Sequence, residues 1–308
     1  YDQANRLVDT YEQVHNSEQE KPDTEVQLAR VITNELGQVK EKNNHIISDR
    51  PAIQSTDFSY NIQGLLTSIN NTDLDDGEGD LFGMKLMYND LGTYATGNTA
   101  KKQYNGNISA IEWTAKYIGA TTFTGKHANI YEYDGMSRLK NSQYYQNKTR
   151  NATNNFDITA TYDDNGNILT IQQKTIDIGY IDNMTYTYDG NKLQTIEDVA
   201  TDVANRGDFF ENVSIATEYL YDGNGNMIED KNRNIKIQYN ELNLPSLVTI
   251  GINTIAYQYT ATGERLKKIV NGITNTYFCG ELVYTDADLQ YINTSEGRIL
   301  KNSSLNLH

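Results

Sequence analysis

The chain has 308 residues, of which 26 are Lys or Arg and 41 are Asp or Glu, so its formal net charge is −15 and its pI is about 4.7. Nucleic acids and anionic membrane surfaces are themselves negatively charged, so this balance argues against both as partners. No apolar stretch approaches the roughly 18 residues that a membrane-spanning helix needs, so we expect no membrane insertion.

A short phrase that begins with Tyr-Asp opens the chain and recurs along it. Its first copy is residues 1–7, and a degenerate copy follows at residues 34–39. Around this degenerate copy Val26, Leu28 and Ile32 lie at even spacing, which predicts strands over residues 25–42. The Glu, Gln, Leu and Lys content of the same stretch also suits a helix, but we favour strands because of the spacing.

Further copies follow at variable intervals through the rest of the chain. They begin at Tyr60, Tyr88, Tyr104, Tyr133, Tyr162, Tyr188, Tyr221, Tyr239 and Tyr259. The interval ranges from 16 residues, between Tyr88 and Tyr104, to 33 residues, between Tyr188 and Tyr221. A motif that recurs in this way is typical of a repeat array with connecting loops of different length.

Each copy predicts a β-hairpin. The residues before the motif alternate between apolar and polar, as in 235–239, and a second alternating run follows it, as in 167–171. Between them stand Asp or Asn with Gly, which favour tight turns, and Asn-Gly is the strongest short hairpin signal. A single hairpin is marginally stable in water, so we expect the hairpins to pair edge to edge in one continuous sheet. With 23 Tyr and 37% hydrophobic residues, we expect a thin core that tyrosine rings help to cover.

One acidic cluster is a weak candidate for calcium. Its members lie within eight positions, punctuated by Gly77 and Gly79: Asp73, Asp75, Asp76, Glu78 and Asp80. Several oxygen ligands on a flexible loop suit Ca²⁺, but Gly77 falls where the helix-loop-helix calcium pattern requires an acid. A solvated acidic loop is the preferred interpretation, and we expect no cofactor.

Residues that could carry catalysis show no supporting pattern. The histidines are His15, His45, His127 and His308, and no two have the spacing that presents two metal ligands together. Phosphate-binding, nucleophile-elbow and zinc-protease motifs are absent from the sequence. Cys279 lies in a strand-like apolar run, so we expect it to be a buried small hydrophobic residue. The sequence therefore predicts a protein that is not an enzyme.

The repeated Tyr-Asp-x-x-Gly-Asn frame resembles the YD repeats of bacterial RHS-repeat proteins. The resemblance extends from Tyr1 to about Gly297, and the octets at 162–169 and 221–228 are its most specific copies. The stretches 60–70, 80–86 and 237–245 are similar to the variety found in Bacteroidetes. The resemblance implies an all-β array of hairpins in a continuous spiralling sheet that forms part of a hollow shell. We expect one repeat domain over residues 1–298, as a fragment of a larger shell, and a C-terminal tail over residues 299–308.

The same resemblance implies two alternative functions for a protein that is secreted or lies at the bacterial cell surface. In the first, the chain is part of a shell that encloses a C-terminal toxin polypeptide absent from these residues. In the second, it is a cell-surface scaffold or adhesin that binds glycans or neighbouring cells through its Tyr- and Asn-rich sheet surface. In either case unpaired strand edges would favour edge-to-edge self-association.

Overall fold

The computed structural model describes residues 1–13, 25–46, 52–75, 77, 79–94, 101–116, 125–150, 155–175, 179–200, 209 and 212–301. Within these residues the chain is nearly all β, and the only helical segment is a short 3-10 helix, η1 (Gly92–Tyr94). The all-β prediction is therefore confirmed, including strands over residues 26–33 and 39–46, where the composition also suited a helix.

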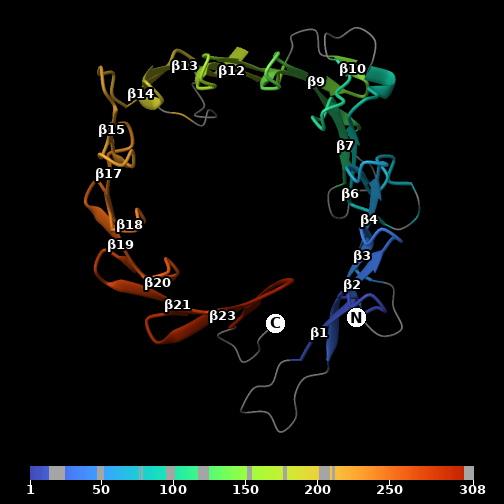
Figure 1. The fold of residues 1–308 in the computed structure, drawn as a ribbon. Coiled ribbons are helices and arrows are strands. Elements are labelled where there is room, and N and C mark those ends of the chain that lie inside the picture. The colour runs from blue at the N-terminus through green and yellow to red at the C-terminus, as the bar shows by residue number, and fades with distance from the viewer. Residues whose placement is uncertain are drawn as a thin grey trace. The chain divides into compact units, whose positions relative to one another are not determined.

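The strands belong to two antiparallel sheets (Figure 1). Strands that follow one another in the chain are neighbours in each sheet, except for the two-residue strand Thr149–Arg150, which pairs with the strand before it but not with the strand after it. The 14-stranded sheet contains β1 (Asp9–Glu12), β2 (Val26–Thr33), β3 (Val39–Ile46), β4 (Gln54–Tyr60), β5 (Leu66–Ile69), β6 (Phe82–Met87), β7 (Ala110–Ala115), β8 (His127–Tyr133), β9 (Leu139–Gln146), β10 (Thr149–Arg150), β11 (Ile158–Tyr162), β12 (Ile168–Thr175), β13 (Gly179–Asp189) and β14 (Lys192–Asp198). The 10-stranded sheet contains β15 (Tyr219–Tyr221), β16 (Met227–Asp230), β17 (Ile235–Tyr239), β18 (Pro245–Ile250), β19 (Asn253–Tyr259), β20 (Arg265–Val270), β21 (Thr274–Cys279), β22 (Leu282–Thr285), β23 (Asp288–Thr294) and β24 (Gly297–Leu300).

Contacts within the chain divide it into two compact units. One consists of residues 1–160 and 172–180, and the other of residues 161–171 and 181–308. Pairing between sequential strands accounts for the internal order of each unit, because every hairpin places its second strand beside its first.

Strand β7 shows how the alternating pattern gives two different faces. Ala110, Glu112 and Thr114 are buried on one face, whereas Ile111 and Trp113 are partly exposed on the other. Successive side chains of a strand point to opposite sides of the sheet, so this period of two follows directly from the backbone. We call the side of β4 to β9 that carries Ala110 the core face and the opposite side the aromatic face.

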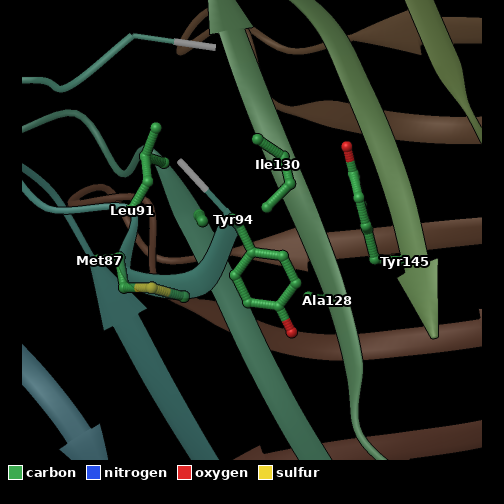
Figure 2. Close-up of a cluster of buried hydrophobic side chains, with 7 residues drawn as sticks. Met87, Leu91, Tyr94, Ala128, Ile130 and Tyr145 are labelled. Carbon is green, nitrogen blue, oxygen red and sulfur yellow. The ribbon is translucent and has the colours of Figure 1, made fainter. Parts of the chain in front are cut away.

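An apolar cluster covers the core face in the first unit. It consists of Met87, Leu91, Tyr94, Ala110, Ala128, Ile130 and Tyr145. Figure 2 shows Met87, Leu91 and Tyr94, from the end of β6 and the segment through η1, gathered with Ile130 and Tyr145 of β8 and β9. The rings of Tyr94 and Tyr145 meet edge to face at 5.6 Å, an arrangement that aromatic pairs favour.

Candidate functional site

The repeated motif folds into one recurrent turn, well defined at residues 222–226. The Asp222 amide donates to the Asn226 carbonyl at 2.9 Å, and the Gly225 amide donates to the Asp222 carbonyl at 3.1 Å. Oδ1 of Asp222 accepts from the amides of Asn224 and Asn226, both at 2.9 Å. The same two backbone hydrogen bonds form around Asp2, Asn34, Asn61, Asp134, Asp163, Asn240 and Thr260. The motif is therefore a hairpin turn closed by its own first polar side chain.

The fourth position of this turn needs a left-handed backbone. Gly225 has φ of +89°, a conformation that glycine adopts without the steric cost other residues bear. The equivalent residues, all at positive φ, are Asn5, Gly37, Gly64, Ser137, Gly166, Asn243 and Gly263. Hydrogen bonds from Asn226 hold the pKa of Asp222 below its ordinary value, so this carboxylate stays ionised as a turn acceptor.

The leading tyrosine has a role that the sequence did not reveal. The Tyr239 hydroxyl donates to the Met227 carbonyl at 2.8 Å, and Met227 is the strand partner of Tyr221 in the preceding copy. Tyr259 in turn donates to the carbonyl of Pro245, the strand partner of Tyr239, at 2.9 Å. The same bond joins Tyr88 to Leu66, Tyr133 to Ile108 and Tyr188 to Ile168. We call this hydrogen bond the tyrosine staple, because it ties each of these five hairpins to the one before it.

Neighbouring turns are also joined side by side. The side-chain amides of Asn224 and Asn226 both donate to Oδ1 of Asn243 at 3.0 Å. In the same way Asn165 and Asn167 donate to Oδ1 of Asn191, at 3.1 and 3.0 Å. Asparagine side chains of the motif therefore form hydrogen bonds between neighbouring turns, along the edge of the sheet where the turns lie.

A polar cluster surrounds Glu112 on the core face of the first unit. Glu112 accepts from the Tyr94 hydroxyl at 2.7 Å and from the Thr72 hydroxyl at 3.1 Å, and Lys126 Nζ lies 3.5 Å from Oε1. Lys126 also lies 2.8 Å from Asp73 Oδ1. These residues line a cavity of about 260 Å³ that Lys85 and Lys148 border as well.

Burial and charge set the protonation of this cluster. Burial, together with the hydrogen bond to Glu112, raises the pKa of Tyr94, so its hydroxyl remains a donor. Burial alone would lower the pKa of Lys126, but the hydrogen bond to Asp73 and the charge of Glu112 outweigh it and raise the pKa. The cluster thus links the segment after β5, η1, β7 and the start of β8 through charge-assisted hydrogen bonds.

The candidate calcium ligands occupy different environments. Asp73 pairs with Lys126, Asp75 accepts from Asn71 at 2.8 Å, and the buried Asp80 accepts from Gln54 at 3.1 Å. Asp76 and Glu78 lie outside the described residues. Among the residues that are described, no group of three or more His, Cys, Asp or Glu side chains is arranged to hold a metal ion. The calcium site stays a prediction.

The histidines and the cysteine complete the candidate residues. His15 and His308 lie outside the described residues, and His45 and His127 lie on different strands, β3 and β8. The expectation of a buried Cys279 is wrong, because its side chain is exposed. Cys279 is the last residue of β21, beside the turn to β22, and an apolar run in a strand does not by itself bury its final residue.

The sequence also gave no sign of an aromatic row on the aromatic face. Trp113, His127, Tyr144 and Phe156 follow one another with ring centroids 5.7, 6.0 and 5.1 Å apart. The first three come from adjacent strands β7, β8 and β9, and the His127 ring nitrogen Nδ1 lies 2.5 Å from the Tyr144 hydroxyl. Strand register brings these rings together, and register was not predictable from motif spacing alone.

Comparison with known proteins finds similarity only at the level of structure. No protein-family model and no curated protein matches the chain. Among solved structures, the Photorhabdus luminescens Tc holotoxin pore with a mutated TccC3 matches 92% of this chain at 14% identity, with a TM-score of 0.52. A complex of TcdB2, TccC3 and Cdc42 matches 98% at 14% identity, with a TM-score of 0.36. A porin-like protein from Bacteroides uniformis matches 89% of this chain, and 91% of its own, at 13% identity, with a TM-score of 0.27.

The holotoxin comparison supports a shared fold. The present chain spans 15% of the length of the matched holotoxin chain, and 21% of the matched chain in the TcdB2 complex. None of the helical structure in the described part of the present chain is long and apolar enough to cross a membrane.

Proposed function

We propose that this chain is a non-catalytic structural segment of a secreted RHS/YD-repeat protein, and that it forms part of a β-shell enclosing a C-terminal toxin. The observation that carries the proposal is the tyrosine staple, together with the turn that precedes each staple. The side chains of Tyr239, Asp222 and Asn226 all form hydrogen bonds to other residues of the repeat array. The most repeated residues therefore hold together the sheet that would form the wall of the shell. The fold similarity to a Tc holotoxin and the YD-repeat resemblance support this assignment.

The polar cluster supports a structural role as well. The carboxylate oxygens of Glu112 accept from Tyr94 and Thr72 and face Lys126, so the side chain is fully engaged in linking segments of the wall. A buried carboxylate with such partners stabilises the packing around it, whereas breaking one contact leaves a buried polar group unsatisfied. We retain the bounds predicted from the sequence, a repeat domain over residues 1–298 and a C-terminal tail over residues 299–308.

The alternative of a glycan-binding surface scaffold accounts less well for the motif residues. That function needs tyrosine and asparagine side chains available to a ligand. Tyr133, Tyr188 and Tyr259 instead donate to backbone carbonyls, and Asn224 and Asn226 bond across to Asn243. These hydroxyl and amide groups are therefore not free to hydrogen-bond a sugar, which favours the shell over the adhesin.

Protease protection tests the proposal in the full-length protein that contains this chain. We expect proteinase K to leave a segment C-terminal to the repeats intact under native conditions, identified by mass spectrometry, and to degrade it after the repeats are unfolded in urea. A variant with two staples removed, Tyr239→Phe with Tyr259→Phe, should shorten the protection. Degradation of the downstream segment at the same rate in native and unfolded samples would refute the enclosure.

A further inference from the structure

The cavity beside Glu112 has the size of a small-molecule site. Its volume is about 260 Å³, and the residues that line it all belong to the first unit. Met87 and Tyr94, both drawn in Figure 2, line its apolar side, and Thr93 of η1 lines it as well. Pockets for drug-sized ligands begin at about 300 Å³, so this cavity suits a compact molecule and not a polypeptide.

The charged residues that line the cavity fall into two sets. Ion pairs hold Lys126 to Glu112 at 3.5 Å and to Asp73 at 2.8 Å. Lys85 and Lys148 are exposed, and neither has a carboxylate partner in the part of the chain that the structure describes. The three lysines and two carboxylates sum to a charge of +1, in a chain whose net charge is −15. The cavity is therefore a locally positive site on an acidic chain.

The two unpaired lysines approach the cavity from opposite sides. Lys85 lies on β6 directly opposite Glu112 of β7, and Lys148 belongs to the turn between β9 and β10. Three strand spacings separate β6 from β9, or about 14 Å at about 4.8 Å each. Both long side chains line the same cavity, so their ammonium groups can take one small ligand between them.

The backbone at Lys148 is unfavourable for a lysine. Asn147 and Lys148 form a two-residue hairpin turn with φ of +49° and +65°, and the second position of such a turn strongly favours glycine. The turn is anchored beside Lys126, because the Asn147 amide donates to the Lys126 carbonyl at 2.7 Å and Asn147 Oδ1 accepts from the Lys126 amide at 2.9 Å. Gly125 leaves room for this contact, since a Cβ there would lie 2.4 Å from Asn147 Oδ1. A strained residue in an anchored turn is typical of a functional position.

We propose that this cavity binds a small phosphorylated molecule, held by Lys85 and Lys148. Lysine ammonium groups bind phosphate as flexible point charges, and a phosphate monoester with a charge of about −1.5 to −2 offers an oxygen to each of them. Glu112 does not compete for the lysines, because each of its carboxylate oxygens already accepts a hydrogen bond from the protein. The bound molecule would bridge β6 to the turn after β9 and so stabilise the first unit, whether or not the shell encloses a toxin.

Lysine acetylation measures binding at single residues of the intact chain. N-acetoxysuccinimide modifies free amines, and mass spectrometry of chymotryptic peptides gives a rate for each lysine. With about 10 mM glycerol 3-phosphate we expect Lys85 and Lys148 to react about threefold more slowly, as for a dissociation constant of about 5 mM. Lys236, whose side chain is 67% exposed in the second unit, should keep its rate. Glycerol, acetate and chloride, the last two at equal ionic strength, are the controls and should protect neither lysine.

Reciprocal variants distinguish one shared ligand from two independent surface lysines. Lys148→Gln should abolish the protection of Lys85, and Lys85→Gln should abolish that of Lys148, because each lysine supplies half of the site. Lys236→Gln should leave the protection of both unchanged. All three lysines are exposed, so each variant should fold, and a melting curve checks that it does.

Four outcomes would overturn the phosphate site. In the first, glycerol 3-phosphate protects neither Lys85 nor Lys148; in the second, it slows Lys236 equally, which is charge screening. In the third, acetate or chloride protects the two lysines as well as glycerol 3-phosphate does. In the fourth, Lys148→Gln leaves the protection of Lys85 intact. The enclosure is judged separately by protease protection, so either proposal can fail while the other stands.

Discussion

Removing one tyrosine staple should loosen the hairpin that it ties down. In Tyr239→Phe the ring stays in place while its 2.8 Å hydrogen bond to the Met227 carbonyl is lost. A hydrogen bond between a neutral donor and acceptor contributes about 1 kcal/mol net, and the partly buried bond here should follow this value. In an array whose stability is shared between neighbours, we expect the loss to be local to β16, β17 and β18.

Amide hydrogen exchange measures this loss directly. About 1 kcal/mol corresponds to roughly fivefold faster exchange of the amides that open with the hairpin. The control is Tyr257→Phe on β19, because no hydrogen-bond partner for the Tyr257 hydroxyl lies among the described residues. Its ring contact with Arg265 would be retained in the phenylalanine variant. Equal exchange in the two variants, or faster exchange throughout the chain in Tyr239→Phe alone, would refute the staple as a local tie.

Further predictions concern the turn, the polar cluster, pH and the sheet edges. Gly225→Val places a β-branched residue at φ of +89° and should lower the free energy of unfolding in urea by about 1–2 kcal/mol. The control Gly223→Ala, at a position without positive φ, should change it by less than about 0.5 kcal/mol. Equal losses in the two variants would contradict the turn geometry. Tyr94→Phe withdraws a donor from the buried Glu112 and should cost about 1–3 kcal/mol by the same measurement, with the exposed Tyr104→Phe as a neutral control. Burial raises the pKa of the staple tyrosines above the unfolded value near 10. The stabilisation they give is therefore complete below about pH 10 and is lost as the pH rises through their higher folded pKa values. A free energy of unfolding that stays constant from about pH 9 to 12 would contradict this. Light scattering should detect self-association through exposed strand edges as concentration rises, and a chain that stays monomeric at high concentration would show that the edges are covered.

Local chemistry could be predicted well from the sequence. The Asp-Asn-Gly frame at 222–226 predicts a hairpin turn because its hydrogen bonds join residues at most four apart. Period-two alternation predicted β2 and β3 even though their composition also suited a helix. The same local reasoning failed for Cys279, because an apolar run indicates a strand but does not show whether a second layer covers it.

Only the tertiary structure decided which side chains meet across strands. Tyr239 reaches Met227 because the hairpins pair in chain order with a defined register, and motif copies at variable spacing do not specify that register. Glu112 collects Tyr94, Thr72 and Lys126 from separate segments, and no local pattern links them. The repeated residues determined the hairpin by themselves, since a turn closes within a few residues. The staples, the polar cluster and the aromatic row depend on contacts between distant segments, which exist only after the strands have paired.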